Sequence, residues 1–295
     1  MRYLSVKEIA KKWNISERSV RNYCFSKRVN GVILDGKTYK IPYNATKPER
    51  IKNKLDNELL NRLKEEKDGK LKGGIYHKTI IELTYNSNHI EGSKLTNEET
   101  RYIFETNTIG IENNKIIKID DIIETVNHFE CFDFILDTVN KILTESYIKH
   151  IHYLLKKGTS DSKKDWFNVG EYKKLPNEVG GYVTSNPEDV KKNMQLLLKQ
   201  YNKIKHKTID DIIYFHKRFE SIHPFQDGNG RVGRIIMFKE CLANNIVPFI
   251  IDEEHKLFYY RGLEKYNIEK GYLLETCLSC QDKYKKYLDY FRIKY

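Results

Sequence analysis

The chain has 295 residues, of which 39% are hydrophobic and 12% aromatic, so a wholly disordered chain is excluded. Its purely apolar runs reach only a few residues, far short of the roughly 20 that cross a bilayer, and charge returns at Lys7 and Glu8, before a signal-peptide core could form. Five cysteines, an odd number, do not indicate a disulfide framework. We therefore expect a cytoplasmic protein without a membrane partner.

The formal net charge of +11 is concentrated near the start of the chain. Residues 1–50 contain 12 Lys and Arg against 4 Asp and Glu, whereas the remainder holds 40 against 37. Such a basic segment is a candidate for contact with a phosphate backbone, because each neutralised phosphate releases counterions. A solvated surface can carry the same charge, so the residue pattern has to decide.

Two short helices and a hairpin are predicted in this basic segment. Ser5 with Glu8 has the spacing of a capping box, and Ser16 is placed to cap a second helix. Asp35-Gly36, between alternating β-branched residues, predicts a tight hairpin. This order of elements resembles the winged helix-turn-helix domains of excisionase and MerR type.

By that resemblance, residues 1–46 form a winged helix-turn-helix domain with the second helix as its recognition helix. The side chains that this helix would present to a DNA groove are Arg18, Ser19, Arg21 and Asn22. Domains of this kind also serve as protein docking modules, so DNA and a docking protein both stay open as partners of residues 1–46.

Residues 47–74 are expected to connect this domain to a second one. They contain mixed charge around Ile51, Leu55, Leu59 and Leu63 and end in Gly73-Gly74, which predicts a connecting helix and a hinge.

From residue 75 onward the apolar spacing is mostly 3 and 4, as in helices. Helix starts are predicted at Thr96, Thr144, Asn186-Pro187 and Thr208, and one long helix is predicted to bury the stripe Ile122, Val126, Phe129, Phe132, Leu136 and Val139. Only residues 171–185, which contain Gly180-Gly181, are predicted to be extended, so the fold class is mainly α with one β-hairpin.

The stretch 223–234 carries the residue types of a phosphoryl or nucleotidyl transfer site. Gly228 and Gly230 flank Asn229 at a helix start, where backbone N–H groups and the helix dipole attract an anion. Arg231 and Arg234, three apart on one helix face, can bind phosphate as forks. Asp227 is the nearest carboxylate for Mg²⁺, and His223 is the residue whose ordinary pKa suits a general base.

This stretch, His223-Pro224-Phe225-Gln226-Asp227-Gly228-Asn229-Gly230-Arg231-Val232-Gly233-Arg234, matches every fixed position of the motif HPFxDGNGRxxR and resembles the Fic family of nucleotidyltransferases. The resemblance covers roughly residues 75–290, and residues 75–295 are expected to form a Fic helical bundle. Within it, residues 171–185 resemble the family's target-binding flap. One departure is Lys173, where the family often has Arg.

The resemblance implies that AMP passes from ATP to a hydroxyl of a target protein. His223 would deprotonate a Ser, Thr or Tyr hydroxyl, and Asp227 would hold Mg²⁺. The implied nucleotide contacts are Phe225 as the anchor of the loop, Gly228, Asn229 and Gly230 at the α- and β-phosphates, Arg231, Arg234 at the γ-phosphate, and Tyr260 beside the base. The target is unknown and includes the protein itself, and a homodimer is one oligomeric state that we keep open.

A second motif lies upstream, in the predicted helix at about residues 78–92. Ser87-Asn88-His89-Ile90-Glu91-Gly92 fits the family's inhibitory pattern [S/T]xxxE[G/N], and Gly92 can end the helix with a left-handed cap. The resemblance implies that Glu91 pairs with Arg234 in the place of the γ-phosphate. Glu91 would then inhibit transfer, and in some similar proteins the same residue assists removal of AMP.

The leading hypothesis is therefore a bacterial protein adenylyltransferase inhibited by Glu91. The alternative is a DNA-binding transcriptional regulator whose helical domain senses nucleotide. No role is predicted for His216, and His152 is expected to be packed or capping rather than a ligand.

Overall fold

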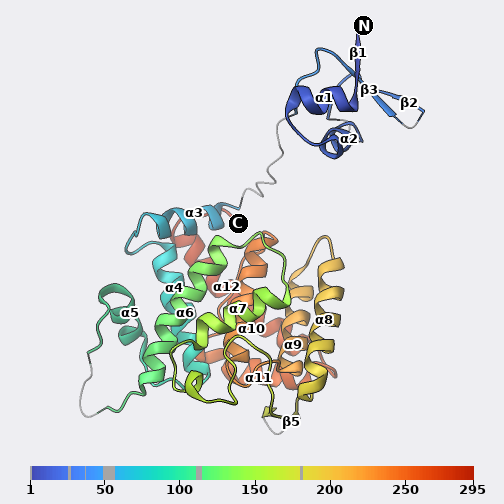
Figure 1. The fold of residues 1–295 in the computed structure, drawn as a ribbon. Helices are drawn as coiled ribbons and strands as arrows, with labels where there is room; N and C mark the ends of the chain where they lie inside the picture. The colour runs from blue at the N-terminus through green and yellow to red at the C-terminus, as the bar shows by residue number, and fades with distance from the viewer. Residues whose placement is uncertain (1, 26–27, 37, 49–56, 111–114, 180–181) are drawn as a thin grey trace. The chain divides into compact units, whose positions relative to one another are not determined.

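The computed structural model describes residues 2–25, 28–36, 38–48, 57–110, 115–179 and 182–295. The chain divides into two compact units, Met1–Leu55 and Asp56–Tyr295. Both ribbons are drawn in Figure 1, coloured along the chain. The predicted positions Ile51, Leu55 and Gly180-Gly181 lie outside the described residues.

The first unit combines two helices with a three-stranded antiparallel sheet. Its elements are β1 (Tyr3–Ser5), α1 (Val6–Trp13), α2 (Glu17–Phe25), β2 (Ile33–Asp35) and β3 (Thr38–Pro42), with the strand order β1-β3-β2. The capping box of Ser5 and Glu8 is confirmed, as is the hairpin, in which Asp35 lies opposite Thr38. Strand β1 was not predicted, because three residues are too few to show an alternating pattern.

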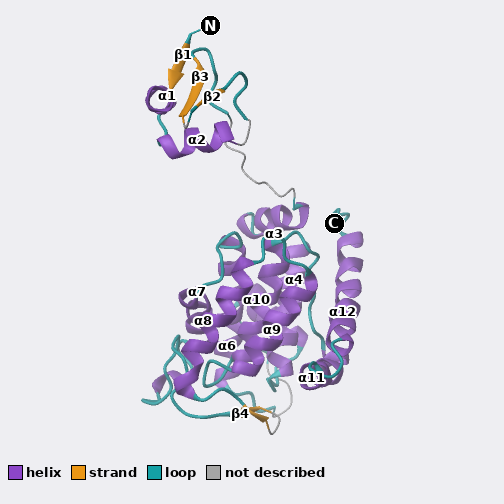
Figure 2. Ribbon diagram, turned by 90° about the vertical axis from the view of Figure 1, so that its right-hand side faces the viewer, coloured by secondary structure: helices purple, strands orange, loops and turns teal. Residues whose placement is uncertain are grey.

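The second unit is helical, as expected, and Figure 2 shows its helices in purple, joined by loops and accompanied by one short hairpin. Its elements are α3 (Glu58–Asp68), α4 (Ile75–Ile90), α5 (Asn97–Thr106), α6 (Ile119–Asp137), α7 (Glu145–Lys156), the short 3-10 helix η1 (Asp161–Lys163), β4 (Glu178–Val179), β5 (Tyr182–Val183), α8 (Pro187–Lys203), α9 (Ile209–Ile222), α10 (Asn229–Ala243), a second 3-10 helix η2 (Glu253–His255), α11 (Lys256–Lys265) and α12 (Gly271–Tyr290). Among the described residues, none of these helices is both long enough and apolar enough for a membrane span.

Helix α10 lies at the centre of this unit, in contact with α4, α6, α7 and α9 (Figure 1). Its side chains are buried on every face, whereas a surface helix would bury only one stripe. The predicted starts at Thr96, Thr144 and Thr208 are confirmed, each with its side chain accepting a hydrogen bond from the first turn. The first turn of α10, which carries the predicted site, is therefore surrounded by other helices.

Two details differ from the expected pattern. Helix α3, in the stretch expected to be a connector, packs Leu59 and Leu63 into the core of the second unit against α4 and α6. In α6, the prediction that Val126 is buried was wrong, because Val126 is 43% exposed. Val139 is buried but lies beyond the end of the helix.

Candidate active site

His223 is the residue at which α9 ends and the loop to α10 begins. Its backbone is left-handed, with φ 51° and ψ 62°, while its N–H donates to the carbonyl of Phe219 at 2.9 Å. Such a φ is uncommon for a non-glycine residue, and it turns the chain sharply out of the helix. Burial, followed by the nearby charge of Lys173, lowers the pKa of His223 to about 4. The imidazole is therefore neutral near pH 7 and can accept a proton.

The loop from residue 224 to residue 228 is held in shape by the side chain of Asn229, the first residue of α10. Asn229 Oδ1 accepts a hydrogen bond from the N–H of Phe225, and Asn229 Nδ2 donates to the carbonyl of Phe225, both at 2.8 Å. Gly228, with φ 80°, caps α10, and the Phe225 ring is fully buried. Asn229 was predicted to contact phosphate, but in this structure its buried side chain shapes the loop.

His152 on α7 packs against this loop, which confirms the expectation that it is packed rather than a ligand, although its partners were not predicted. Its ring stacks on Phe225 with centroids 3.9 Å apart and planes 2° from parallel. Nδ1 accepts a hydrogen bond from the N–H of Gly170 at 2.9 Å, so Nε2 carries the proton and donates to the carbonyl of Asp227 at 3.1 Å. Burial lowers the pKa of His152 to about 3, which keeps the ring neutral.

Asp227 lies at the edge of a buried ionic cluster. Its Oδ2 accepts hydrogen bonds from Lys156 Nζ at 2.7 Å and from Arg231 Nη2 at 3.2 Å. Lys156 also contacts Glu124 and Asp161, and Arg231 contacts Glu124. Burial acts to raise the pKa of Asp227, but Arg231 and Lys156 hold it well below its ordinary value.

The donor set of this cluster fits a magnesium ion at Asp227. The Asp227 side chain is 49% exposed, whereas those of Glu124 and Asp161 are 11% and 23% exposed. Mg²⁺ in phosphate sites is commonly held by one or two carboxylates with phosphate oxygens and water. Asp227 is therefore the carboxylate of this cluster that is best placed to meet a metal and a phosphate together.

Arg234, one turn into α10, is held by the end of α4. Its Nε donates to Ser87 Oγ at 3.0 Å, and its Nη2 donates to the Ser87 carbonyl at 2.9 Å and to Glu91 Oε1 at 2.6 Å. Burial acts to raise the pKa of Glu91, but Arg234 and then Arg231 lower it below its ordinary value. The structure thus brings together Ser87, Glu91 and Arg234.

The carboxylate of Glu91 lies over Gly230 in the first turn of α10. A Cβ placed on Gly230 would come within 2.3 Å of Glu91 Oε1, so the absence of a side chain makes room for this anion. The first N–H groups of a helix favour a negative charge. Glu91 therefore occupies a place suited to a phosphate.

Two predicted residues border the end of α4. Gly92 follows it with φ 97°, which confirms the left-handed termination. Tyr260, on α11, is 39% exposed and its hydroxyl donates to the Ile90 carbonyl at 3.4 Å. Tyr260 therefore lies against the end of the helix that carries Glu91.

Lys173 joins the flap to the catalytic loop. Its N–H donates to the Pro224 carbonyl at 2.9 Å, and its buried Nζ donates to Asn177 Oδ1 at 2.6 Å and to Thr184 Oγ1 at 2.5 Å. Asn177 in turn donates to the carbonyl of Phe225 at 3.1 Å. The two sides of the β4–β5 hairpin are therefore attached to the loop that begins at His223.

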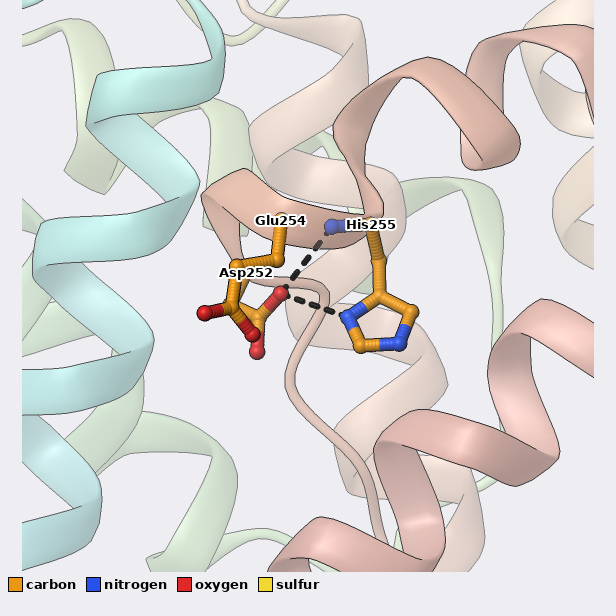
Figure 3. A group of neighbouring side chains, drawn as sticks. All are labelled: Asp252, Glu254 and His255. Carbon is orange, nitrogen blue, oxygen red and sulfur yellow. Dashed lines mark hydrogen bonds and ion pairs between the residues drawn. The ribbon is translucent and has the colours of Figure 1, made fainter.

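A separate cluster of Asp252, Glu254 and His255 lies at η2 (Figure 3). Asp252 Oδ1 lies 2.6 Å from His255 Nδ1, and Lys283 Nζ on α12 contacts Asp252 at 2.6 Å and Glu254 at 3.3 Å. The Lys283 ammonium thus supplies the positive charge that these carboxylates face, and the cluster attaches η2 to α12.

In the first unit, the residues predicted to face DNA lie along α2. Arg18, Arg21 and Asn22 are exposed and Ser19 is partly buried. Arg21 pairs with Glu17 at 2.8 Å within the helix. The structure therefore places Arg18, Arg21 and Asn22 on the surface of the unit.

The second unit is similar in sequence and in fold to known proteins. Residues 142–241, from the loop before α7 into α10, match the model of the Fic/DOC family. A Fic domain-containing signaling protein from Bacteroides thetaiotaomicron has a similar fold, with TM-score 0.61 and 24% identity, covering 78% of this chain and 94% of the other. Fic-1 from C. elegans gives TM-score 0.62 at 17% identity, covering 81% and 73%. The second unit therefore has the fold of Fic proteins.

Curated relatives are named protein adenylyltransferase Fic. The protein of Nematostella vectensis is 28% identical over 232 residues, which are 72% of this chain and 51% of the relative. That of Drosophila melanogaster is 26% identical over 191 residues, 62% of this chain and 36% of the relative. The chain thus spans about half of the first relative and about a third of the second.

His152→Ala should lower the free energy of unfolding by about 3 kcal/mol, because it removes a buried ring and leaves the Gly170 N–H and the Asp227 carbonyl without that partner. His150→Ala, on the exposed side of the same helix, is the matched control and should cost about 1 kcal/mol or less. Urea titrations followed by helical circular dichroism measure both. Equal losses in the two variants would contradict the role given to His152.

Proposed function

We propose that the second unit is a protein adenylyltransferase that moves AMP from ATP to a Ser, Thr or Tyr hydroxyl of a target protein and is inhibited by Glu91. The observation that carries the proposal is the contact of Glu91 with Arg234 at 2.6 Å, over Gly230 at the start of α10. A carboxylate held there shows that the first turn of α10 accommodates an anion. The family match and the names of the relatives support AMP as the group transferred.

The chemistry follows from the position of each side chain. Neutral His223 accepts the proton of the target hydroxyl, whose oxygen attacks the α-phosphorus of ATP. The bond from that phosphorus to the bridging oxygen of the β-phosphate breaks, and pyrophosphate leaves. The N–H groups at the start of α10 and the guanidinium of Arg234 stabilise the charge on the phosphates.

Asp227 would hold Mg²⁺, which when bound neutralises phosphate charge. His152 and Asn229 keep the loop in shape, and Lys173 keeps the flap close to the proton acceptor His223. Nucleotide has to displace Glu91 from Arg234 if the γ-phosphate is to take its place. Inhibition is thus a competition between two anions for one guanidinium.

Glu91→Gly should raise the rate of AMP transfer at least about tenfold, because it frees Arg234 for the nucleotide and removes a competing negative charge. A contact worth about 1.4 kcal/mol corresponds to a tenfold change in affinity. Incubation with α-labelled ATP and Mg²⁺, followed by counting of protein-bound label, measures the rate. Glu91→Gln keeps the size of the side chain and is the control for charge, while His223→Ala in the Glu91→Gly protein should abolish labelling.

A Glu91→Gly protein that labels neither itself nor any protein of a lysate, with any of the four nucleoside triphosphates, would refute the proposal. Target already labelled by the Glu91→Gly protein that then loses its label with the wild type, but not with Glu91→Gly, would indicate a role of Glu91 in removing AMP.

The protonation of His223 gives a second test. Because burial lowers its pKa to about 4, the neutral form is present throughout the range above about pH 5 and is lost as the pH falls through 4. The ring ¹⁵N chemical shifts of His223 in the free protein, assigned by comparison with His223→Ala, should stay constant from pH 8 to pH 5.5. An ordinary histidine, with a pKa near 6.5, would titrate within this range. A midpoint above pH 6 would show that the ring is not desolvated as the structure indicates.

For the first unit we propose a winged helix-turn-helix domain that binds DNA, supported by its local charge and by the exposure of Arg18 on α2. Arg18→Ala in the full chain should weaken DNA binding about tenfold in gel-shift titrations, as loss of a base or phosphate contact does. Lys205→Ala, which removes an exposed charge from the second unit, should leave binding unchanged. No retardation by the wild-type protein, even at low salt, would favour a docking protein as the partner.

A further inference from the structure

Lys156 is a buried lysine that the mechanism above does not use. It ends α7, and its side chain is 2% exposed. Its Nζ contacts three carboxylates, those of Glu124, Asp161 at 3.0 Å and Asp227 at 2.7 Å. A buried ammonium is costly unless it is fully paired, and Lys156 is paired on three sides.

The charges of this cluster cancel. Glu124, Asp161 and Asp227 carry three negative charges, and Lys156, Arg231 and Lys164, which lies 2.6 Å from Asp161, carry three positive charges. Lys156 and Arg231 contact the same oxygen of Asp227, Oδ2. The carboxylate that fits a metal is thus already neutralised by side chains of the protein.

We infer that Lys156 is the resident counter-cation of Asp227. It is a positioning residue that fixes the carboxylate and prevents a divalent cation from binding there before the nucleotide does. The inference rests on the proposed function, because it takes Asp227 as the metal ligand of a nucleotide site.

The physical reason is repulsion between the Lys156 ammonium and a divalent ion. The ammonium lies 2.7 Å from Asp227 Oδ2, so an ion held by Asp227 would be its near neighbour. A unit charge and a divalent ion about 5 Å apart repel each other enough to lower affinity about tenfold, even at the dielectric constant of water. Nucleotide phosphates bring negative charge and their own oxygen ligands, and so offset this repulsion. Lys156 therefore favours entry of the metal together with the nucleotide.

Mn²⁺ is the probe that tests this inference, measured by electron paramagnetic resonance on the full chain without nucleotide. Lys156→Gln removes the charge but keeps hydrogen-bond donors, and it should tighten Mn²⁺ binding at least about tenfold. Lys156→Arg keeps the charge and should bind Mn²⁺ as weakly as the wild type. Adding Asp227→Asn to Lys156→Gln should abolish the gain.

Lys239→Gln is the matched control. Lys239 is also buried, 1% exposed, and its Nζ donates to the Lys141 carbonyl and to Glu240 Oε1, both at 2.6 Å. Its substitution should destabilise the protein without changing Mn²⁺ affinity. If Lys156→Gln does not fold, Lys156→Gln with Glu124→Gln restores the net charge of the cluster, and a gain of about threefold or more is expected from the loss of the ammonium beside Asp227.

Unchanged Mn²⁺ affinity in the folded Lys156 variant, or a gain that persists with Asp227→Asn, would overturn the inference. The measurement needs no AMP transfer, so it can be read separately from the labelling experiment. Lack of labelling by Glu91→Gly would refute the proposed function, whereas unchanged Mn²⁺ binding would refute only the role of Lys156.

Discussion

The burial of charged groups around the first two turns of α10 is the constraint on which the second unit depends. Arg231 and Arg234 are 5% and 4% exposed, so each guanidinium needs a carboxylate partner within the protein. Three surrounding helices supply the ionic partners of this region. Helix α6 contributes Glu124 to Arg231, α7 contributes Lys156 to Asp227, and the end of α4 contributes Glu91 to Arg234. The helices that pack around α10 therefore also supply the charges that neutralise its buried side chains.

Of these partners, Glu91 differs from Glu124 in a way that bears on the proposed inhibition. The Glu124 side chain is 11% exposed and is enclosed by two cations, whereas the Glu91 side chain is 30% exposed and has its ion pair with Arg234 alone among the described residues. Separating a buried pair is strongly unfavourable when one charge is left alone, but not when another anion replaces the lost partner. A phosphate at Arg234 would be such a replacement. The same interaction can thus stabilise the nucleotide-free protein and compete with nucleotide.

The loop from His223 to Arg234 and the contact with Glu91 were accessible from the sequence, because each belongs to a motif of fixed spacing. The helix starts at Thr96 and Thr208 were accessible for the same reason, since a capping box is a local pattern. Lys156 and Glu124 were missed because they meet Asp227 and Arg231 across 71 and 107 residues. One local signal was present: His152 and Lys156 lie four apart on α7, and both belong to its buried face. Two polar residues on the buried face of an amphipathic helix indicate a polar partner, but they do not say which one.

Under the proposed function, the protein carries its own substitutes for both charges of a metal–nucleotide complex. Glu91 supplies an anion to Arg234, and Lys156 supplies a cation to Asp227. The two substitutes differ in what binding requires of them. If the γ-phosphate binds Arg234 as proposed, Glu91 has to move, and it stands at the end of a helix, next to a glycine with φ 97°. Lys156 is enclosed by three carboxylates and can stay in place, because its partner Asp227 keeps an exposed side toward the solvent. In the proposed mechanism, relief of inhibition at Glu91 therefore changes the phosphate end of the site while the cation end keeps its geometry, so that displacement of a single carboxylate would separate the inhibited protein from the active one.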